Sequence, residues 1–340
     1  MYIAKKDIMP TEQSPFIITI GASAGGLSAI GEIVSHLHKD INAAIFVVLH
    51  LSKAAMSDIL LSRVQKNSPL PCKIAEDKEP IRQGQIYIAA PDTHLLVKED
   101  KVLIGQGPPE NRFRPSIDVL FRSAAVSHRE KVIGIIVTGF LNDGTIGMQA
   151  IKHSGGYCLV QDPNEAEYPD MPLSVLESVE VDHVVPLRKM GEAILERINT
   201  AEIKGISPPE SVVAESKLSE KAATSIEEVS KLGDESAFSC PDCGGRLWSI
   251  KNGKLKHYRC HIGHAYSEND LLLRQGETTE ATLWAAVRMM EERKLLVEKI
   301  AREHGDRGLY KISSHYSEQS KSLREHITRL KELLFGISKQ

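Results

Sequence analysis

Short apolar runs alternate with stretches of helical period over the first 199 residues. The runs at 17–20, 43–49 and 132–137 are apolar at almost every position, which is typical of parallel strands buried on both faces. The pattern predicts further strands at 86–90, 95–97, 102–104 and 157–160, and helices at 27–37, 56–64, 114–124, 144–153, 173–179 and 190–198. Strands and helices that alternate in this way predict an α/β fold with a doubly wound parallel sheet.

The pattern changes near residue 200. Residues 200–236 are rich in Ser, Glu, Lys and Pro and lack aromatic residues, so they are predicted to be a linker. Farther on, two apolar stripes of helical spacing separated by a break at 304–308 predict an antiparallel helical hairpin. The chain therefore divides into a flexible tail at 1–14, the α/β domain at 15–199, the linker at 200–236, a small block at 237–266 and the hairpin at 267–340.

The linker offers no aromatic anchor for a large apolar interface between the two halves of the chain. We therefore expect the halves to fold separately. On this hypothesis residues 1–199 keep their activity toward a small substrate when the rest of the chain is removed.

Composition narrows the class of protein. The net charge of −3 at 26% charged residues argues against a nucleic-acid partner, which would need a basic surface. No apolar run reaches membrane-spanning length and the N-terminus has no apolar signal segment, so we expect a cytoplasmic protein without direct membrane insertion.

Three predicted strands end in polar residues that together suit acyl transfer. Ser23 follows the first strand in a turn with Gly25 and Gly26, His50 follows the second, and Asp143 follows the run at 132–137 through a short loop. In acyl transfer an imidazole removes the serine proton, and a carboxylate fixes the imidazole tautomer and stabilises the imidazolium. The sequence therefore predicts a catalytic triad of these three residues.

Other interpretations of the same residues remain open. A glycine-rich turn between strand and helix is often a phosphate site, but the dinucleotide pattern needs glycine where Ser23 stands, and no Walker lysine follows. His50 could merely end a strand, and Asp143 could merely cap the helix that follows it.

Cysteine spacing points to a second chemistry. Cys240 and Cys243 form a C-x2-C pair, and Cys260 and His264 follow after sixteen residues as C-x3-H. Four such ligands suit tetrahedral zinc in a closed structural site, with His261 as the alternative to His264. A redox C-x-x-C is the rival interpretation, but no thioredoxin-like strand and helix precede it. A block this small would depend on the metal to fold.

Four ordered motifs resemble the catalytic domain of the bacterial chemotaxis protein-glutamate methylesterase, CheB. They are Gly21-Ala22-Ser23-Ala24-Gly25-Gly26, Val48-Leu49-His50, the run at 111–125 and Thr138-Gly139-Phe140-Leu141-Asn142-Asp143-Gly144. The resemblance covers roughly 15–199 and implies a Rossmann-like methylesterase domain with Ser23, His50 and Asp143 as its triad. It also implies hydrolysis of γ-methyl glutamate esters on receptor helices without a catalytic cofactor, and in many members deamidation of receptor glutamines.

The chain departs from this family at several positions. Ala24 stands where the family usually has threonine, and Phe140 and Leu141 stand where it has Met and Gly. The resemblance places Ala24 and Phe140 at the oxyanion and substrate site, and the bulk of Leu141 would narrow the site or demand a different backbone angle. The family's usual receiver domain would need about a hundred residues before the esterase, so we expect no control by phosphorylation within this chain.

Two functions follow from these observations. The first is a serine esterase acting on a methylated receptor helical bundle, alongside a cognate methyltransferase or signalling complex. Arg112 and Arg114 are its candidate contacts to acidic receptor surface, although either could instead serve solubility or packing. The second is a scaffold of the same fold in which the altered lining has ended catalysis.

Overall fold

The computed structural model describes residues 14–50, 57–252 and 255–337. The predicted tail at 1–14 lies outside these ranges except for Ser14. Contacts divide the chain into two units, residues 1–270 and residues 271–340.

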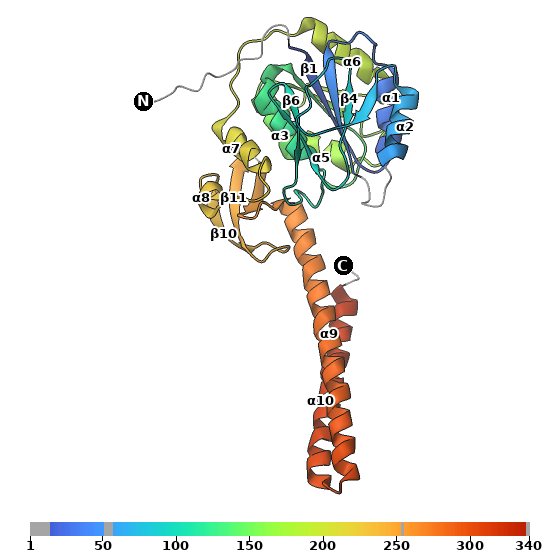
Figure 1. Ribbon diagram of the computed structural model, residues 1–340, viewed down its shortest axis with the longest axis vertical. Coiled ribbons are helices and arrows are strands. Elements are labelled where there is room, and N and C mark those ends of the chain that lie inside the picture. The colour runs from blue at the N-terminus through green and yellow to red at the C-terminus, as the bar shows by residue number, and fades with distance from the viewer. Residues whose placement is uncertain (1–13, 51–56, 253–254, 338–340) are drawn as a thin grey trace. The chain divides into compact units, whose positions relative to one another are not determined.

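A seven-stranded sheet forms the centre of the first unit (Figure 1). Every neighbouring pair of its strands is parallel. In sheet order the strands are β3 (Cys72–Ile74), β4 (Ile86–Ile88), β2 (Ala43–Leu49), β1 (Phe16–Ala22), β7 (Val132–Ile136), β8 (Tyr157–Gln161) and β9 (His183–Val185). All side chains of β1, β2 and β7 are buried, which is why these strands are the apolar runs of the sequence.

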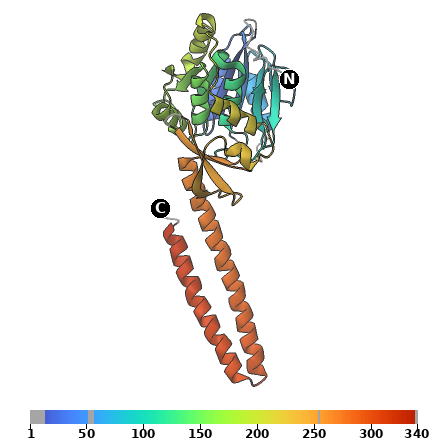
Figure 2. The same cartoon turned by 90° about the vertical axis from the view of Figure 1, so that its left-hand side faces the viewer.

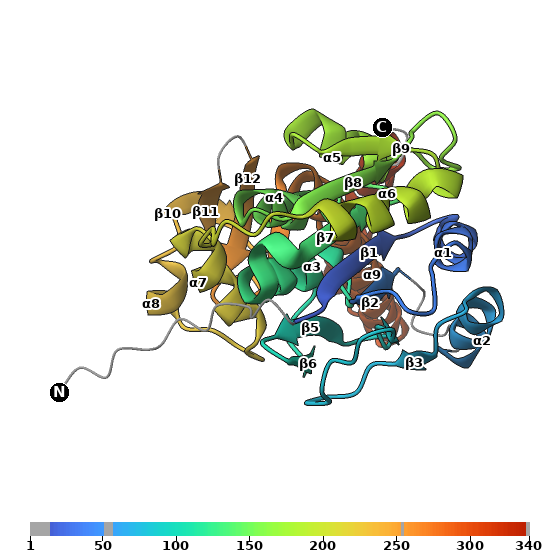
Figure 3. The ribbon, with the colours of Figure 1, turned by 90° about the horizontal axis from the view of Figure 1, so that it is seen from above.

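Helices cover both faces of this sheet and enclose two separate apolar cores (Figure 3). One core includes side chains of α1 (Gly26–Ser35), α2 (Ser57–Asn67) and α6 (Leu187–Thr200). The other includes side chains of α3 (Ile117–His128), α4 (Thr145–His153), α5 (Asp170–Ser178) and the hairpin of β5 (His94–Lys98) and β6 (Lys101–Gly105); a short 3-10 turn, Arg129–Lys131, follows α3. The predicted doubly wound sheet is confirmed, while the short edge strands β3 and β9 were not predicted.

The segment at 200–236 differs from the predicted linker, because it forms α7 (Glu210–Ser219) and α8 (Ile226–Val229). Val212 of α7 belongs to a core of the sheet, and Glu215 is 1% exposed. Polar composition suggested a solvated segment, but the buried face of α7 mixes Val212 and Leu218 with Glu215, Ser216 and Ser219. The charge of Glu215 is paired inside the protein.

A second, antiparallel sheet follows α8. Its strands are β10 (Asp234–Ser239), β11 (Arg246–Asn252), β12 (Leu255–Cys260) and β13 (Ala265–Ser267). We call residues 234–267 the C-terminal module. Trp248 of this module packs with Leu218 of α7 and Val229 of α8.

Five charged or titratable side chains meet where α3, α7 and the C-terminal module touch. Glu110 lies 2.7 Å from Arg122 and 2.7 Å from Arg259, measured between carboxylate oxygen and guanidinium nitrogen. Glu215 accepts hydrogen bonds from His257 at 2.9 Å and from Arg259 at 3.2 Å. All five side chains are at most 4% exposed, and we call this set the buried ion cluster. It joins the two halves that the sequence suggested would fold separately.

The second unit contains most of α9 (Glu268–Asp306) and all of α10 (Tyr310–Ile337), which run side by side (Figures 1 and 2). The two helices pack through Val287, Ile327 and Leu334, with Leu283, Met290 and Leu330 around them. The turn at 307–309 lies at the predicted break. Across the described residues, no helix combines the length and the apolar character that crossing a membrane requires.

Candidate active site

Ser23 occupies the turn from β1 to α1, at the carboxyl end of a central strand. Its backbone N–H donates to the Thr138 carbonyl at 3.1 Å, and its carbonyl accepts from Gly26 N–H at 2.9 Å. Gly25 has φ of 73°, in the left-handed region that favours glycine, and caps α1. A Cβ on Gly26 would lie 2.5 Å from Ala22 Cβ, so the small residues of this motif allow a turn too tight for larger ones.

His50 follows β2 and is held on three sides. Its backbone N–H donates to the Ala22 carbonyl at 3.0 Å, and its Nε2 lies 2.9 Å from Asp143 Oδ2. Its ring stacks on Phe113 with centroids 3.6 Å apart and planes inclined by 6°. The other ring nitrogen, Nδ1, is buried and has no hydrogen-bond partner among the residues that the structure describes.

Asp143 lies 1% exposed, where the loop after β7 meets the first turn of α3. Its carboxylate accepts from Ile117 N–H at 2.7 Å, from Ser116 Oγ at 3.0 Å and from Asn111 Nδ2 at 3.1 Å, in addition to His50. Burial opposes ionisation, yet the hydrogen bond and the charge of His50 hold the pKa of Asp143 below its ordinary value. The carboxylate is therefore kept ionised beside the imidazole.

Asp118 is a second buried carboxyl group close to Asp143. It accepts from Asn111 Nδ2 and from Gly147 N–H, both at 2.6 Å. Burial first, and the negative charge of Asp143 second, raise the pKa of Asp118 well above its ordinary value. The two carboxyl groups thus differ in the charge state that their surroundings favour.

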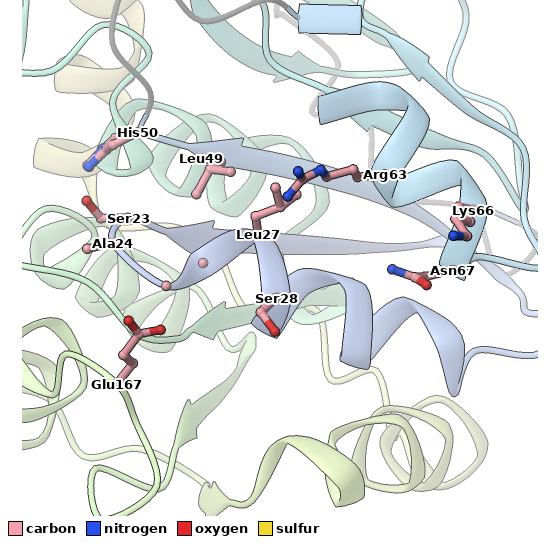
Figure 4. Close-up of a pocket in the computed structure, with 12 residues that line it drawn as sticks. Ser23, Ala24, Leu27, Ser28, Leu49, His50, Arg63, Lys66, Asn67 and Glu167 are labelled. Atoms are coloured by element: carbon pink, nitrogen blue, oxygen red, sulfur yellow. The ribbon is translucent and has the colours of Figure 1, made fainter. Parts of the chain in front are cut away.

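Ser23 and His50 line the same cleft of about 690 Å³, and their side chains point toward each other (Figure 4). Three strand ends of one sheet therefore bring the three predicted residues together. The walls of the cleft carry Ala24, Leu27, Ser28, Leu49, Arg63, Lys66, Asn67 and Glu167.

The residues of the fourth sequence motif border Ser23. A Cβ on Gly139 would lie 2.7 Å from Ser23 Cβ and 2.2 Å from Met171 Sδ, so only glycine fits there. Phe140 is 48% exposed, and its ring packs in a tilted arrangement against the ring of Tyr168, with the ring centroids 4.3 Å apart. Leu141 has φ of 66°, so it adopts the backbone angle that suits a glycine.

The two predicted arginine contacts have different surroundings. Arg114 donates to Asp92 at 2.8 and 3.1 Å and to the Gly107 carbonyl at 2.9 Å, which neutralises its charge locally. Arg112 is exposed.

Arg63 and Lys66 line the cleft but were not predicted from the sequence. They are ordinary exposed positions of an amphipathic helix, so no pattern distinguished them. The roles of Asn111 and Phe113 were also missed, although both stand in a motif that carried the family resemblance.

The four predicted metal ligands gather in the C-terminal module. One ligand atom from each of Cys240, Cys243, Cys260 and His264 lies within 4.8 Å of the others, and we call them the Cys3His cluster. The sulfur atoms of Cys243 and Cys260 are 3.7 Å apart, and His264 Nδ1 lies 3.5 Å from Cys260 Sγ. None of these three cysteines is in a disulfide.

Comparison with known proteins agrees with this geometry. The family model described as CheB methylesterase matches residues 18–194. A Leptospira interrogans protein with "protein-glutamate methylesterase/protein-glutamine glutaminase" in its name is 41% identical over 180 residues, covering 52% of this chain and 92% of that protein. A Maricaulis maris protein of the same name is 34% identical over 187 residues, covering 54% of this chain and 46% of that protein.

The solved structures give the same answer. The crystal structure of the Thermotoga maritima CheB methylesterase catalytic domain matches with a TM-score of 0.52 at 34% identity, covering 54% of this chain and 98% of that chain. The family model covers just over half of the 340 residues. The chain belongs to the CheB methylesterase family.

Proposed function

We propose that this chain hydrolyses the γ-methyl esters of glutamate side chains in a helical signalling receptor, with Ser23 as nucleophile. The observation that carries the proposal is the 2.9 Å contact between His50 and Asp143, which leaves His50 Nδ1 for the serine in the same cleft (Figure 4). Family membership supports the substrate, and the family resemblance supports the cytoplasm as its compartment.

The proposed reaction follows from these positions. His50 Nδ1 takes the proton of Ser23 Oγ as that oxygen attacks the ester carbonyl carbon, and the ionised Asp143 stabilises the imidazolium. Methanol leaves with the proton that His50 returns, and an acyl-enzyme remains. Water then attacks by the same route and releases the glutamate carboxylate and Ser23. With a glutamine substrate the leaving group is ammonia, which extends the same chemistry to deamidation.

Backbone N–H groups of Ala24 and Phe140 are the proposed donors to the oxyanion. Both lie beside Ser23, Ala24 in the same turn and Phe140 directly after Gly139, whose missing side chain permits the close approach. The side chain of Phe140 then forms an exposed rim for the substrate.

Acidic segments of the substrate have cationic partners on the cleft wall. Arg63 and Lys66 are exposed on α2 and line the cleft, so we propose them as contacts to carboxylates near the reacting ester. Arg112 and Arg114 both stay proposed contacts on the surface, and Arg114 would share its charge with Asp92.

The Cys3His cluster is the proposed site of one structural Zn²⁺. Ligand atoms at about 2.3 Å from a tetrahedral ion lie roughly 3.8 Å from one another. The spacings of 3.5 and 3.7 Å among the sulfur and nitrogen atoms fit that arrangement. His264 is the proposed fourth ligand, because its Nδ1 lies 3.5 Å from Cys260 Sγ and 3.7 Å from Cys240 Sγ. Metal analysis of protein purified without chelators should find about one zinc per chain.

The function is tested with a small methyl ester, a methylated receptor fragment and a serine-hydrolase probe. Ser23→Ala should abolish probe labelling and lower methanol release by about 10⁴-fold or more, without a change in the thermal unfolding temperature. Ser35→Ala, at the last residue of α1, is the matched control and should retain both the labelling and the methanol release. A wild-type protein that binds the receptor fragment but neither labels nor releases methanol would be a scaffold.

A further inference from the structure

Strand β13 lies between the Cys3His cluster and the candidate triad. Tyr266, its middle residue, belongs to the cluster side, because its hydroxyl lies 3.2 Å from Cys240 Sγ and donates to Asp242 at 2.5 Å. The residues before and after it contact the catalytic domain. The Ala265 carbonyl accepts from Asn111 N–H at 2.8 Å, and Ser267 N–H donates to Asn111 Oδ1 at 3.1 Å.

The side-chain amide of Asn111 makes three hydrogen bonds. Its two Nδ2 hydrogens go to Asp143 Oδ1 at 3.1 Å and to Asp118 Oδ2 at 2.6 Å, and its Oδ1 accepts from Ser267. The ionised Asp143 carboxylate requires the nitrogen on one side, and the Ser267 N–H requires the oxygen on the other. Asn111 is 3% exposed, so these hydrogen bonds lie inside the protein. Ser267 therefore fixes which way this amide faces.

Ser267 also holds the loop on the other side of Asp143. Its Oγ accepts from Asn142 Nδ2 at 2.8 Å and donates to Asp270 at 2.6 Å. Asn142 immediately precedes Asp143 in the chain. One residue of the C-terminal module thus contacts the two side chains, Asn111 and Asn142, that flank the carboxylate of the candidate triad.

We propose that Asn111 is a positioning residue for Asp143, and that metal in the Cys3His cluster sets the rate of ester hydrolysis by folding β13 against it. This inference rests on the methylesterase function proposed above. Metal binding orders His264, the residue that leads directly into β13. Without β13 the Asn111 amide loses the Ser267 contact that fixes its orientation, and it becomes free to turn away from Asp118 and Asp143.

Loss of this orientation should act on the chemical step. An Asp143 carboxylate that can rotate stabilises the imidazolium less well, and geometric errors of about 1 Å cost about 10²-fold in rate. Asn111 does not line the substrate cleft. We therefore expect kcat for a small methyl ester to fall by about 10²-fold while KM stays unchanged, and the acidic limb of the pH profile to move to lower pH.

Asn111→Gly is the variant of choice, because Asn111 has φ of 48° and glycine adopts that angle without strain. Lys78→Gly is the matched control, since Lys78 is exposed at φ of 64° in a loop away from the cleft. The control should keep the wild-type kcat and pH profile. Asn111→Asp keeps the size of the side chain but removes both donors, and we expect it to lose at least as much activity as Asn111→Gly.

The metal arm of the test uses a strong zinc chelator, followed by added Zn²⁺. Chelation should lower kcat of the wild type to the level of Asn111→Gly, and Zn²⁺ should restore it. Chelation should lower the kcat of the Asn111→Gly variant little further, because both changes break the same contact between β13 and Asn111. Amide hydrogen exchange of segment 110–118 should rise on chelation, which reports on the coupling independently of activity.

The outcomes separate this inference from the proposed function. If the wild type neither hydrolyses esters nor labels at Ser23, the proposed function is wrong, and hydrogen exchange still decides whether the metal orders segment 110–118. If the wild type is active, and chelation and Asn111→Gly both leave kcat and exchange unchanged, the inference is overturned.

Discussion

The first unit has two kinds of interior. Apolar side chains fill the cores on both faces of the sheet, and Ile20, Ile45 and Ile133 are fully buried in one of them. The buried ion cluster, where α3 meets α7 and the C-terminal module, is equally inaccessible but contains carboxylates, guanidinium groups and an imidazole. The apolar core and the buried ion cluster are therefore equally buried, but different interactions stabilise them.

The apolar core gains stability in proportion to the area removed from water, whereas the ion cluster is stable only as a complete set. Removing one methylene from the core leaves a small void. Removing one charge from the cluster leaves its partners desolvated and unpaired. The junction between the two halves should thus be all-or-none, while the sheet should tolerate small changes.

Truncation of the chain should cause the largest loss of stability. A fragment of residues 1–199 keeps Glu110 and Arg122 but loses Glu215, Arg259 and the β13 contacts to Asn111. We expect its loss of stability to exceed the roughly 3–5 kcal/mol that breaking one buried ion pair costs. Thermal unfolding should show 1–199 strongly destabilised and 1–270 close to the full chain. The sequence alone suggested that residues 1–199 fold and act without the rest of the chain, and this prediction is the opposite. Equal stability of the two fragments would support the earlier expectation.

The substitution Glu215→Gln should cause the next largest loss of stability. Gln keeps the size and one acceptor but removes the charge that faces Arg122, His257 and Arg259, so we expect a loss of about 3–5 kcal/mol. In a Trp284→Phe background the buried Trp248 is the one remaining tryptophan, and its fluorescence in urea reports on the module.

The control for Glu215→Gln is Glu220→Gln. Glu220 pairs with the half-exposed Lys98 at the surface, and such pairs contribute about 0–1 kcal/mol. Losses of similar size for the two variants would mean that the ion cluster is open to water.

The sheet was predictable because its signals are local. Apolar runs at β1, β2 and β7 and helical spacing between them follow directly from burial on two faces. The edge strands β3 and β9 are three residues long, which is too short to produce a pattern. Helix α7 was missed because its buried face includes Glu215, Ser216 and Ser219, and polar residues suggest solvent until their partners are known.

Some residues of the candidate site could likewise be predicted from the sequence, and others could not. Ser23, His50 and Asp143 follow strands and could be proposed from position, and the Cys3His cluster from spacing. Asn111 and Ser267 could not, because their contact joins residues 156 positions apart whose meeting depends on the docking of two sheets. The sequence contains these residues but not the register in which the sheets meet.

Acid should distinguish the two interiors. Burial alone would raise the pKa of Glu110, but the charges of Arg122 and Arg259 lower it to about 2, from an ordinary value of 4.5. A lowered pKa contributes stability that is complete above about pH 4.5 and lost as pH falls toward 2, here about 3 kcal/mol. Glu110→Gln should lower stability at pH 7 and flatten this dependence. Unfolding free energies at several pH values check it, and an unchanged slope in the variant would contradict it.

The smallest expected loss of stability comes from a substitution in the apolar core. Ile45→Val removes one methylene from a fully buried position of β2, where valine suits the strand equally well, so we expect a loss of about 1 kcal/mol. The side chain does not titrate, and the loss should be the same at pH 7 and at pH 3. Urea unfolding of Ile45→Val and Glu110→Gln at both pH values makes the comparison direct. If Ile45→Val cost as much as Glu215→Gln, or if its cost changed with pH, the sheet and the ion cluster would be one cooperative interior rather than two.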